Sequence, residues 1–434
     1  MKKYLTMIAA AALVLACSNE TEDLVIPSSG NAIAFSASTD GNSTRAIGEI
    51  ADQAALQTLT FEASNRDRIG DTKTGVRGIG IFGCYTGKLK YEQTTVSCDF
   101  MYNQQVTWDN ASSTWKYNPV KYWPNENNDY LSFFAYAPYE PDPQDDGRCI
   151  IEISDNYELG DPWLNYRLSK NPWGLITDTS DPAYKSETQV DLMYGTKKTG
   201  TSAPYTYSAW TDQQHFKQDG TLSGDVTLDN KVEFTFKHAL ACVGDEIRIK
   251  LAQDAADKLN GYAKIKLNKL TIAYKNLTNK ARLVLNPKDG EANWKEIISG
   301  ELTTTRTFVK EFTDVEIVMG GTSPGATATV AGADAIAEGY LVPSTDDKGN
   351  GLFYIPLQIA GTDKAYAEVT LNYTVDNGVT KYTDDATTQF DLDMNLEGKS
   401  QNIVITLLKD LDLHHLVFVL SSDAAEPSYG RLFK

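Results

Sequence analysis

The sequence lacks several features that whole classes of protein require. After its first residues it has no apolar run long enough to cross a bilayer as a helix, which argues against a membrane-spanning protein. It has no CxxC spacing of the kind found in zinc sites, and only four histidines. Acidic residues also outnumber basic ones, 58 to 40, which gives a formal net charge of -18. The field of such a protein would repel a phosphate backbone, so we expect no nucleic acid partner. Since no motif supplies the ligands of a metal or the fingerprint of a cofactor, we expect neither.

Patterns that normally carry catalysis are also missing. The stretch 321–325 spells GxSxG, but Ser323 is followed by Pro324. Proline has no backbone N–H, and the oxyanion hole of a serine hydrolase uses the N–H at that position. The aspartates at 391 and 393 begin like a calcium loop, yet Leu396 stands where that loop needs glycine. No histidine has a catalytic neighbour in sequence, so the chain is predicted not to be an enzyme.

The N-terminus has the pattern of an export signal. Lys2 and Lys3 precede an apolar run through Ala16, which is the charged and apolar arrangement of a signal peptide over residues 1–16. The run ends at Cys17 in a sequence that resembles a lipobox, so Cys17 is the predicted lipidation site, carrying fatty acyl chains such as palmitate. An ordinary signal peptide that ends near a cysteine is the alternative. The acidic stretch 19–23 resembles the tether of surface lipoproteins in some Gram-negative bacteria.

Residues 17–45 form a predicted propeptide with one strand in it. Ile33, Phe35 and Ala37 alternate with small residues, which is the period of a half-buried strand. The turn-rich segment 40–43 follows and presents Arg45 and Ala46 in a loop of the kind that proteases cut. Cleavage between Arg45 and Ala46 would separate this first strand from the rest of the chain.

The remainder of the chain reads as many short strands broken by turns, which indicates an all-β protein built of sandwiches. At 434 residues, two domains of roughly 200 residues each are expected. Six of the seven tryptophans precede residue 211, whereas the second half is aliphatic, so the two cores differ. We place the N-terminal sandwich at 46–230 and the C-terminal one at 231–434. Within the latter, a phase shift in the apolar pattern predicts a bulge at Asn268 and Lys269.

Four cysteines remain after Cys17: Cys84, Cys98, Cys149 and Cys242. Outside the cytoplasm such thiols can form disulfides, and a pair such as Cys84 with Cys98 could bridge adjacent strands. The sequence leaves the pairing open.

The last strand pattern, 413–420, is unusual for a chain end. Its apolar residues occupy both faces: Leu416, Val417, Phe418, Val419 and Leu420. Left exposed, such a strand would promote aggregation, so it has to be buried. It is either the last core strand of its own domain or a strand donated to a neighbour, and the sequence does not choose between these.

The aromatic residues of the first half indicate glycan binding as an alternative function. Exposed rings can act as stacking platforms for sugars, and the candidates for such a monomeric glycan-binding lipoprotein are Trp108, Trp115, Tyr117, Trp123, Trp163 and Trp173.

Several stretches of residues 1 to about 245 resemble, in order and spacing, the fimbrillin family of type V pilins. Besides the lipobox and Arg45, the resemblance is carried by these sequences: YWP at 122–124, FFAYAP at 133–138, DLMYG at 191–195, FKHALA at 236–241 and, in the second half, YLVP at 340–343. The chain departs from the family pattern in having no tryptophan after Trp294 and in ending with a polar tail.

The resemblance implies two tandem transthyretin-like β-sandwich domains. It also implies a pathway of export, maturation and assembly. The precursor would be an outer-membrane lipoprotein at the cell surface, cut after Arg45 by an arginine-specific protease. Such a protease could also cut at Arg66, Arg68 or Arg77. Loss of the strand at 32–37 would open a groove, and a donor strand from another pilin subunit, here Leu416 to Leu420, would fill it. The product would be an extracellular fimbria that supports adhesion. Whether the subunit forms the stalk, the tip or the anchor stays open.

Overall fold

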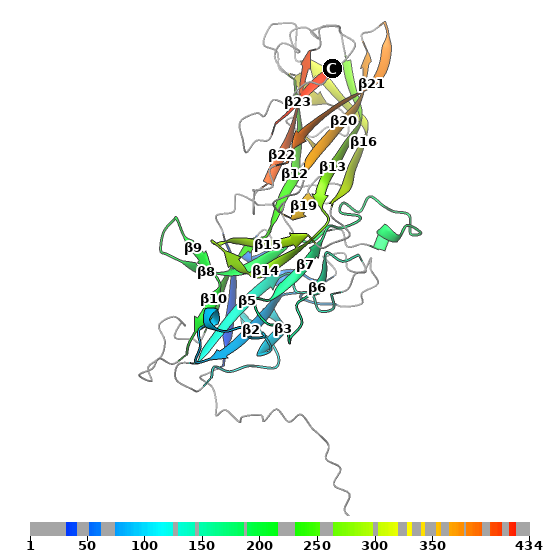
Figure 1. The fold of residues 1–434 in the computed structure, drawn as a ribbon. Coiled ribbons are helices and arrows are strands. Elements are labelled where there is room, and N and C mark those ends of the chain that lie inside the picture. The colour runs from blue at the N-terminus through cyan, green and yellow to red at the C-terminus, as the bar shows by residue number, and fades with distance from the viewer. Residues whose placement is uncertain are drawn as a thin grey trace, which may run out of the picture.

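The computed structural model describes sixteen stretches of the chain and consists almost entirely of strands (Figure 1). The described residues are 32–40, 52–61, 74–124, 129–143, 147–185, 189–215, 231–251, 264–297, 303–319, 328–331, 340–342, 353–356, 364–376, 379–392, 400–409 and 416–421. The all-β prediction is confirmed. No helix in these stretches is long and apolar enough to cross a membrane.

The N-terminal half is dominated by a nine-stranded sheet in the order β1-β11-β8-β5-β2-β3-β4, with β10 on β5 and β9 on β8. Its strands are β1 (Ala34–Thr39), β2 (Ile79–Gly87), β3 (Met101–Asp109), β4 (Thr114–Lys116), β5 (Tyr130–Ala137), β8 (Met193–Thr199), β9 (Thr206–Ser208), β10 (Trp210–Gln213) and β11 (Lys231–His238). β1 is therefore the terminal strand of this sheet. It pairs in parallel with β11, whereas the other pairings within the sheet are antiparallel.

A four-stranded sheet in the order β15-β14-β7-β6 packs near this sheet. Its strands are β6 (Ile150–Ile153), β7 (Trp163–Arg167), β14 (Lys280–Lys288) and β15 (Glu291–Ile297). β14 pairs with β7, so a hairpin from the second half of the sequence completes a sheet begun in the first.

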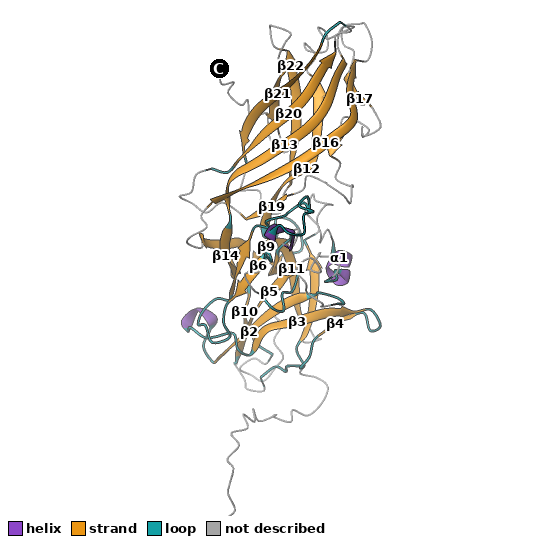
Figure 2. Ribbon diagram, turned by 90° about the vertical axis from the view of Figure 1, so that its right-hand side faces the viewer, coloured by secondary structure: helices purple, strands orange, loops and turns teal. Residues whose placement is uncertain are grey.

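Two five-stranded sheets make up the C-terminal part, which stands above the nine-stranded sheet in an elongated molecule (Figures 1 and 2). One has the order β18-β12-β22-β23 with β19 on β12, and the other is β17-β16-β13-β20-β21. The strands are β12 (Leu240–Leu251), β13 (Lys264–Thr278), β16 (Thr303–Met319), β17 (Ala328–Ala331), β18 (Tyr340–Val342), β19 (Phe353–Pro356), β20 (Tyr366–Asp376), β21 (Lys381–Asp391), β22 (Ser400–Lys409) and β23 (Leu416–Ser421).

The period-two alternation of strands divides the buried residues into two clusters. In β2, Ile81 faces one cluster and Phe82 the other; in β5, Phe133 and Phe134 are divided in the same way. One cluster continues through the four-stranded sheet into the C-terminal sheets. The second lies on the opposite face of the nine-stranded sheet and includes Leu56 of the only described α-helix, α1 (Gln53–Thr58), whose N-terminus Asp52 caps by accepting from Ala55 N at 2.8 Å.

The sheet pairings cross the expected division at residues 230 and 231. β11 begins at Lys231 yet lies inside the nine-stranded sheet, and the β14–β15 hairpin extends the sheet of β6 and β7. The domain bounds and the transthyretin-like topology stay predictions. The bulge at Asn268 is confirmed, because both partners of β13 shift register between Leu267 and Lys269.

Candidate functional site

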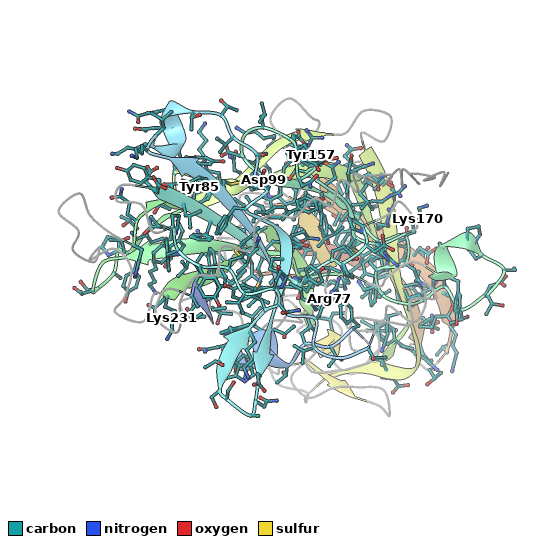
Figure 3. The ribbon with its side chains drawn as sticks, turned by 90° about the horizontal axis from the view of Figure 1, so that it is seen from below. Arg77, Tyr85, Asp99, Tyr157, Lys170 and Lys231 are labelled. Atoms are coloured by element: carbon teal, nitrogen blue, oxygen red, sulfur yellow. A yellow bond between two sulfur atoms is a disulfide. The ribbon has the colours of Figure 1, made fainter. Side chains whose placement is uncertain are left out.

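The candidate site is the groove that β1 occupies at the end of the nine-stranded sheet. Ala34 pairs with Lys231 and the register continues to Thr39 with Phe236, so β1 is held along its length by one parallel ladder. Figure 3 shows Lys231, the first residue of β11, at the periphery of the molecule. On the other side of β1 the described contacts are local: an isolated bridge joins Ala32 to Tyr122, and Ile33 N donates to Lys121 O at 2.9 Å.

The side chains of β1 fill an apolar groove. Ile33, Phe35 and Ala37 are each no more than 3% exposed, in keeping with the alternation of the sequence. The ring of Phe35 meets Tyr117 edge-on at 5.3 Å between centroids, Phe133 edge-on at 5.7 Å, and Phe234 in a stacked arrangement at 6.3 Å. Without β1 these rings would lie against water, so the groove needs an occupant.

A tyrosine fixes the N-terminal end of the strand. The Tyr117 hydroxyl donates to Ile33 O at 2.7 Å and also approaches Lys121 O at 3.2 Å. Burial raises the pKa of Tyr117 to about 12. The phenol therefore remains a proton donor to the β1 backbone at neutral pH.

Asp40, directly after β1, fixes the other end. Its backbone N–H donates to Phe236 O at 3.0 Å, which extends the ladder by one bond. Its carboxylate accepts from Lys198 Nζ at 3.1 Å and from the Tyr207 hydroxyl at 2.5 Å. Burial first, and the hydrogen bond to Asp40 second, raise the pKa of Tyr207 above its usual range. We call Lys198 and Tyr207 the carboxylate cradle; it ties the end of β1 to the β8–β9 hairpin.

Beside the half-buried face of β1 there is open space. A cavity of about 540 Å³ runs along the strand, bordered by its residues 34–38 and by the indole rings of three tryptophans, Trp108, Trp115 and Trp210. Residues 34, 36 and 38 are alanine and serines, so the space results from small side chains on β1. A larger cavity of about 700 Å³ lies beside β9 and the turn between β14 and β15, where Lys237 Nζ donates to Gly290 O at 2.6 Å.

The candidate donor strand, β23, also lies at the end of a sheet. It pairs antiparallel with β22, from Lys409 with Leu416 to Val404 with Ser421. In this subunit it therefore occupies the place of a last strand in its own domain, one of the two alternatives that the sequence left open. Its use by a neighbour stays a prediction.

Of the other predicted site residues, the structure describes some and not others. Cys17, Arg45 and Ala46 lie outside the described residues. Cys84 and Cys98 form a disulfide, and Cys149 and Cys242 are buried. No group of three or more His, Cys, Asp or Glu side chains within the described stretches is arranged to hold a metal.

The proposed glycan-stacking rings are mostly inside. Trp115, Trp123 and Trp163 are at most 9% exposed. The ring of Trp123 packs edge-on against Phe133 and stacks on His215. Because a stacking platform needs an accessible ring face, these three rings do not provide one.

The carboxylate cradle is the feature that sequence reasoning missed. Asp40 and Lys198 are separated by 158 residues, and neither stands in a motif. A carboxylate immediately after an isolated strand was the single available signal, and it points to no particular partner.

Comparisons with known proteins complete the description. No family model matches the chain. Over 216 residues it is 27% identical to the fimbrium subunit Fim1C of Phocaeicola vulgatus; the match covers 44% of this chain and 56% of that protein, so the chain spans about half the length of this curated relative. A crystal structure of a fimbrial protein from Bacteroides vulgatus has a similar fold, with a TM-score of 0.54 at 18% identity, covering 91% of this chain and 99% of the other. In sequence the chain is therefore similar to a fimbrium subunit and in fold to a fimbrial protein, as its resemblance to the fimbrillin family predicts.

Proposed function

We propose that the protein is a structural subunit of a cell-surface fimbria and not an enzyme. In this proposal it is exported as an outer-membrane lipoprotein acylated at Cys17, cut by an arginine-specific protease between Arg45 and Ala46, and assembled with other pilin subunits by donor-strand exchange, which supports adhesion. The relative named as a fimbrium subunit supports the fimbrial role.

The observation that carries the proposal is the position of β1. A terminal strand held by one ladder can leave without breaking the order of the sheet behind it, because the ladders of β11 with β8 and beyond are untouched. Its departure would expose the groove around Phe35, and an exposed apolar groove at a sheet edge is the receptor for β-strand addition.

The energetics favour a long-lived polymer. The five apolar side chains of Leu416 to Leu420, at about 1.5–3 kcal/mol each, supply on the order of 10 kcal/mol before ladder hydrogen bonds are counted. An association of that strength dissociates very slowly.

Arg45 is favoured as the cleavage site over Arg77, because Arg77 is buried. Arg77 has no exposed surface, and its guanidinium lies 3.6 Å from the equally buried carboxylate of Glu140. It lies among densely packed side chains in the view from below (Figure 3). A protease would have to unfold the sheet to reach Arg77.

The test uses the chain from residue 18, which removes the lipid anchor. It is treated with an arginine-specific protease, while mass spectrometry follows the cut and unboiled SDS gels follow polymer formation. We expect loss of the segment up to Arg45 together with an SDS-resistant ladder. The Arg45→Ala variant is the matched control and should give neither. A trimmed protein that stays monomeric would contradict assembly by strand exchange of this subunit with itself.

A further inference from the structure

The C-terminal segment 416–423 has the residue pattern of the first strand and its anchor, 33–40. At a constant offset, the matching pairs are Ile33 and Leu416, Phe35 and Phe418, Ser38 and Ser421, Thr39 and Ser422, and Asp40 and Asp423. The match includes the aromatic residue at the centre of the groove and the carboxylate that ends the strand.

These positions are the ones through which β1 is held. Ile33 and Phe35 face the buried cluster, and Asp40 occupies the carboxylate cradle. Leu416, Phe418 and Leu420 share one parity of the chain, so in an extended conformation they project from one face, as Ile33, Phe35 and Ala37 do.

Building on the proposed strand exchange, we infer that residues 416–423 of a neighbouring copy enter the groove parallel to β11. Phe418 takes the place of Phe35, and the Asp423 carboxylate takes the place of Asp40 between Lys198 and Tyr207. The cradle is thus a binding subsite for a carboxylate of the next subunit.

The carboxylate cradle favours a donor strand that runs parallel to β11 over one that runs antiparallel to it. When β1 leaves with Asp40, the Lys198 ammonium and the Tyr207 hydroxyl lose the acceptor they share. An antiparallel donor could also place Phe418 over the Phe35 position, because apolar residues flank Phe418 on both sides. That register puts Leu413 at the Asp40 position. It would leave a partly buried cation and donor facing a leucine, which is unfavourable.

The cavity along β1 favours replacement of β1 by the donor strand, because larger side chains of the donor can fill it. Small residues of β1 border that cavity. In the parallel register Val417 and Val419 replace Ala34 and Ser36 on the half-buried face of the strand. Each donor side chain is larger and more apolar than the residue it replaces, and Trp108, Trp115 and Trp210 line the space that they would enter. The half-buried face of β1 is thus loosely packed, and the donor strand packs more fully there.

Cross-linking reads the register directly. Ser38 pairs with Thr235 of β11, so the parallel register brings Ser421 of the donor opposite Thr235, and the antiparallel register brings His415 there. Neighbouring strands lie close enough for a disulfide between opposed cysteines. A Thr235→Cys acceptor is mixed with a Ser421→Cys donor or with a His415→Cys donor, both without the lipid anchor, trimmed by the protease and then oxidised.

We expect a reducible dimer that survives boiling in SDS with Ser421→Cys and not with His415→Cys. The opposite preference would overturn the parallel register while leaving strand exchange intact, because the unboiled ladder of the unmodified protein reports assembly in any register. Absence of that ladder would overturn strand exchange and, with it, this inference.

The carboxylate subsite has its own test. Asp423→Asn should increase the dissociation rate of the polymer about tenfold, because a charge-assisted contact is lost. Glu426→Gln removes the same charge three residues later and should leave the rate unchanged. Equal rates for Asp423→Asn and the unmodified chain would exclude Asp423 as the ligand of the cradle.

Discussion

The carboxylate of Asp40 lies 3.1 Å from the ammonium of Lys198, although 158 residues separate them. This contact joins the end of the first strand to the β8–β9 hairpin, and the Tyr207 hydroxyl donates to the same carboxylate. A strand with one ladder is therefore fixed at its end by a polar anchor whose strength is modest. Such an anchor suits the role proposed for β1, a strand that stays in place until proteolysis removes it.

Breaking this anchor should loosen β1 measurably. The Asp40 and Lys198 side chains are 16% and 27% exposed, so we expect a coupling of about 0.5–1 kcal/mol between Asp40→Asn and Lys198→Met in a double-mutant cycle. Amide hydrogen exchange of residues 34–39 in the intact chain is the measurement. The pair Lys275 and Glu368, of similar exposure in the C-terminal sheets, is the matched control; its removal should leave exchange in β1 unaltered. Additive effects of the two anchor substitutions would contradict the coupling.

Phe35 is the main apolar contribution of the strand. Phe35→Ala should lower the free energy of unfolding of the nine-stranded sheet by about 3 to 5 kcal/mol, because it leaves a void among Tyr117, Phe133 and Phe234. Chemical denaturation of the uncleaved chain checks this value. Ser36→Ala, on the half-buried face of the same strand, should change stability by less than about 0.5 kcal/mol. A comparable loss in both variants would argue against a specific role of the groove.

Alkaline pH should weaken the hold on β1 through Tyr117. Its pKa is raised to about 12 by burial, from an ordinary value of 10.0. A pKa raised on folding means that the stabilisation is complete below pH 10 and is lost as the pH rises towards 12. The two-unit difference corresponds to roughly 3 kcal/mol. Urea denaturation at several pH values between 9 and 12 measures the slope, and Tyr117→Phe should make it shallower. An unchanged slope in that variant would assign the effect to other tyrosines.

The Cys84–Cys98 disulfide should stabilise the N-terminal half. It closes a short loop across 14 positions, for which chain entropy in the unfolded state predicts about 3 kcal/mol. The double variant Cys84→Ser, Cys98→Ser should lower the melting temperature, and dithiothreitol should shift the unmodified chain in the same direction while leaving the variant where it is. A reductant effect on the variant would point to a source other than this bond.

The local pattern of the chain predicted much of the fold. Alternation identified the buried face of the first strand at Ile33 and Phe35, and that of β20 at Val369 and Leu371, all of which are buried. The phase shift at Asn268 predicted the register shift in β13. These features depend on neighbours along one strand, where a side-chain period of two leaves a direct trace in the sequence.

Pairing between distant strands left no such trace. The alternation of Val232 and Phe234 was visible, yet nothing in it indicated that β11 joins the first sheet or that its partner is β1. The hairpin of β14 and β15 was equally ambiguous, because a strand with one apolar face satisfies any sheet that offers a complementary surface.

The sequence by itself determined an all-β chain and the apolar character of β1 and β23, since these follow from composition and short-range period. The tertiary structure decided which strand β1 pairs with, that Lys198 and Tyr207 meet Asp40, and that small residues leave a cavity beside the tryptophans. Those relationships arise when segments far apart in the chain close against one another, and their geometry depends on the packing of the whole sheet.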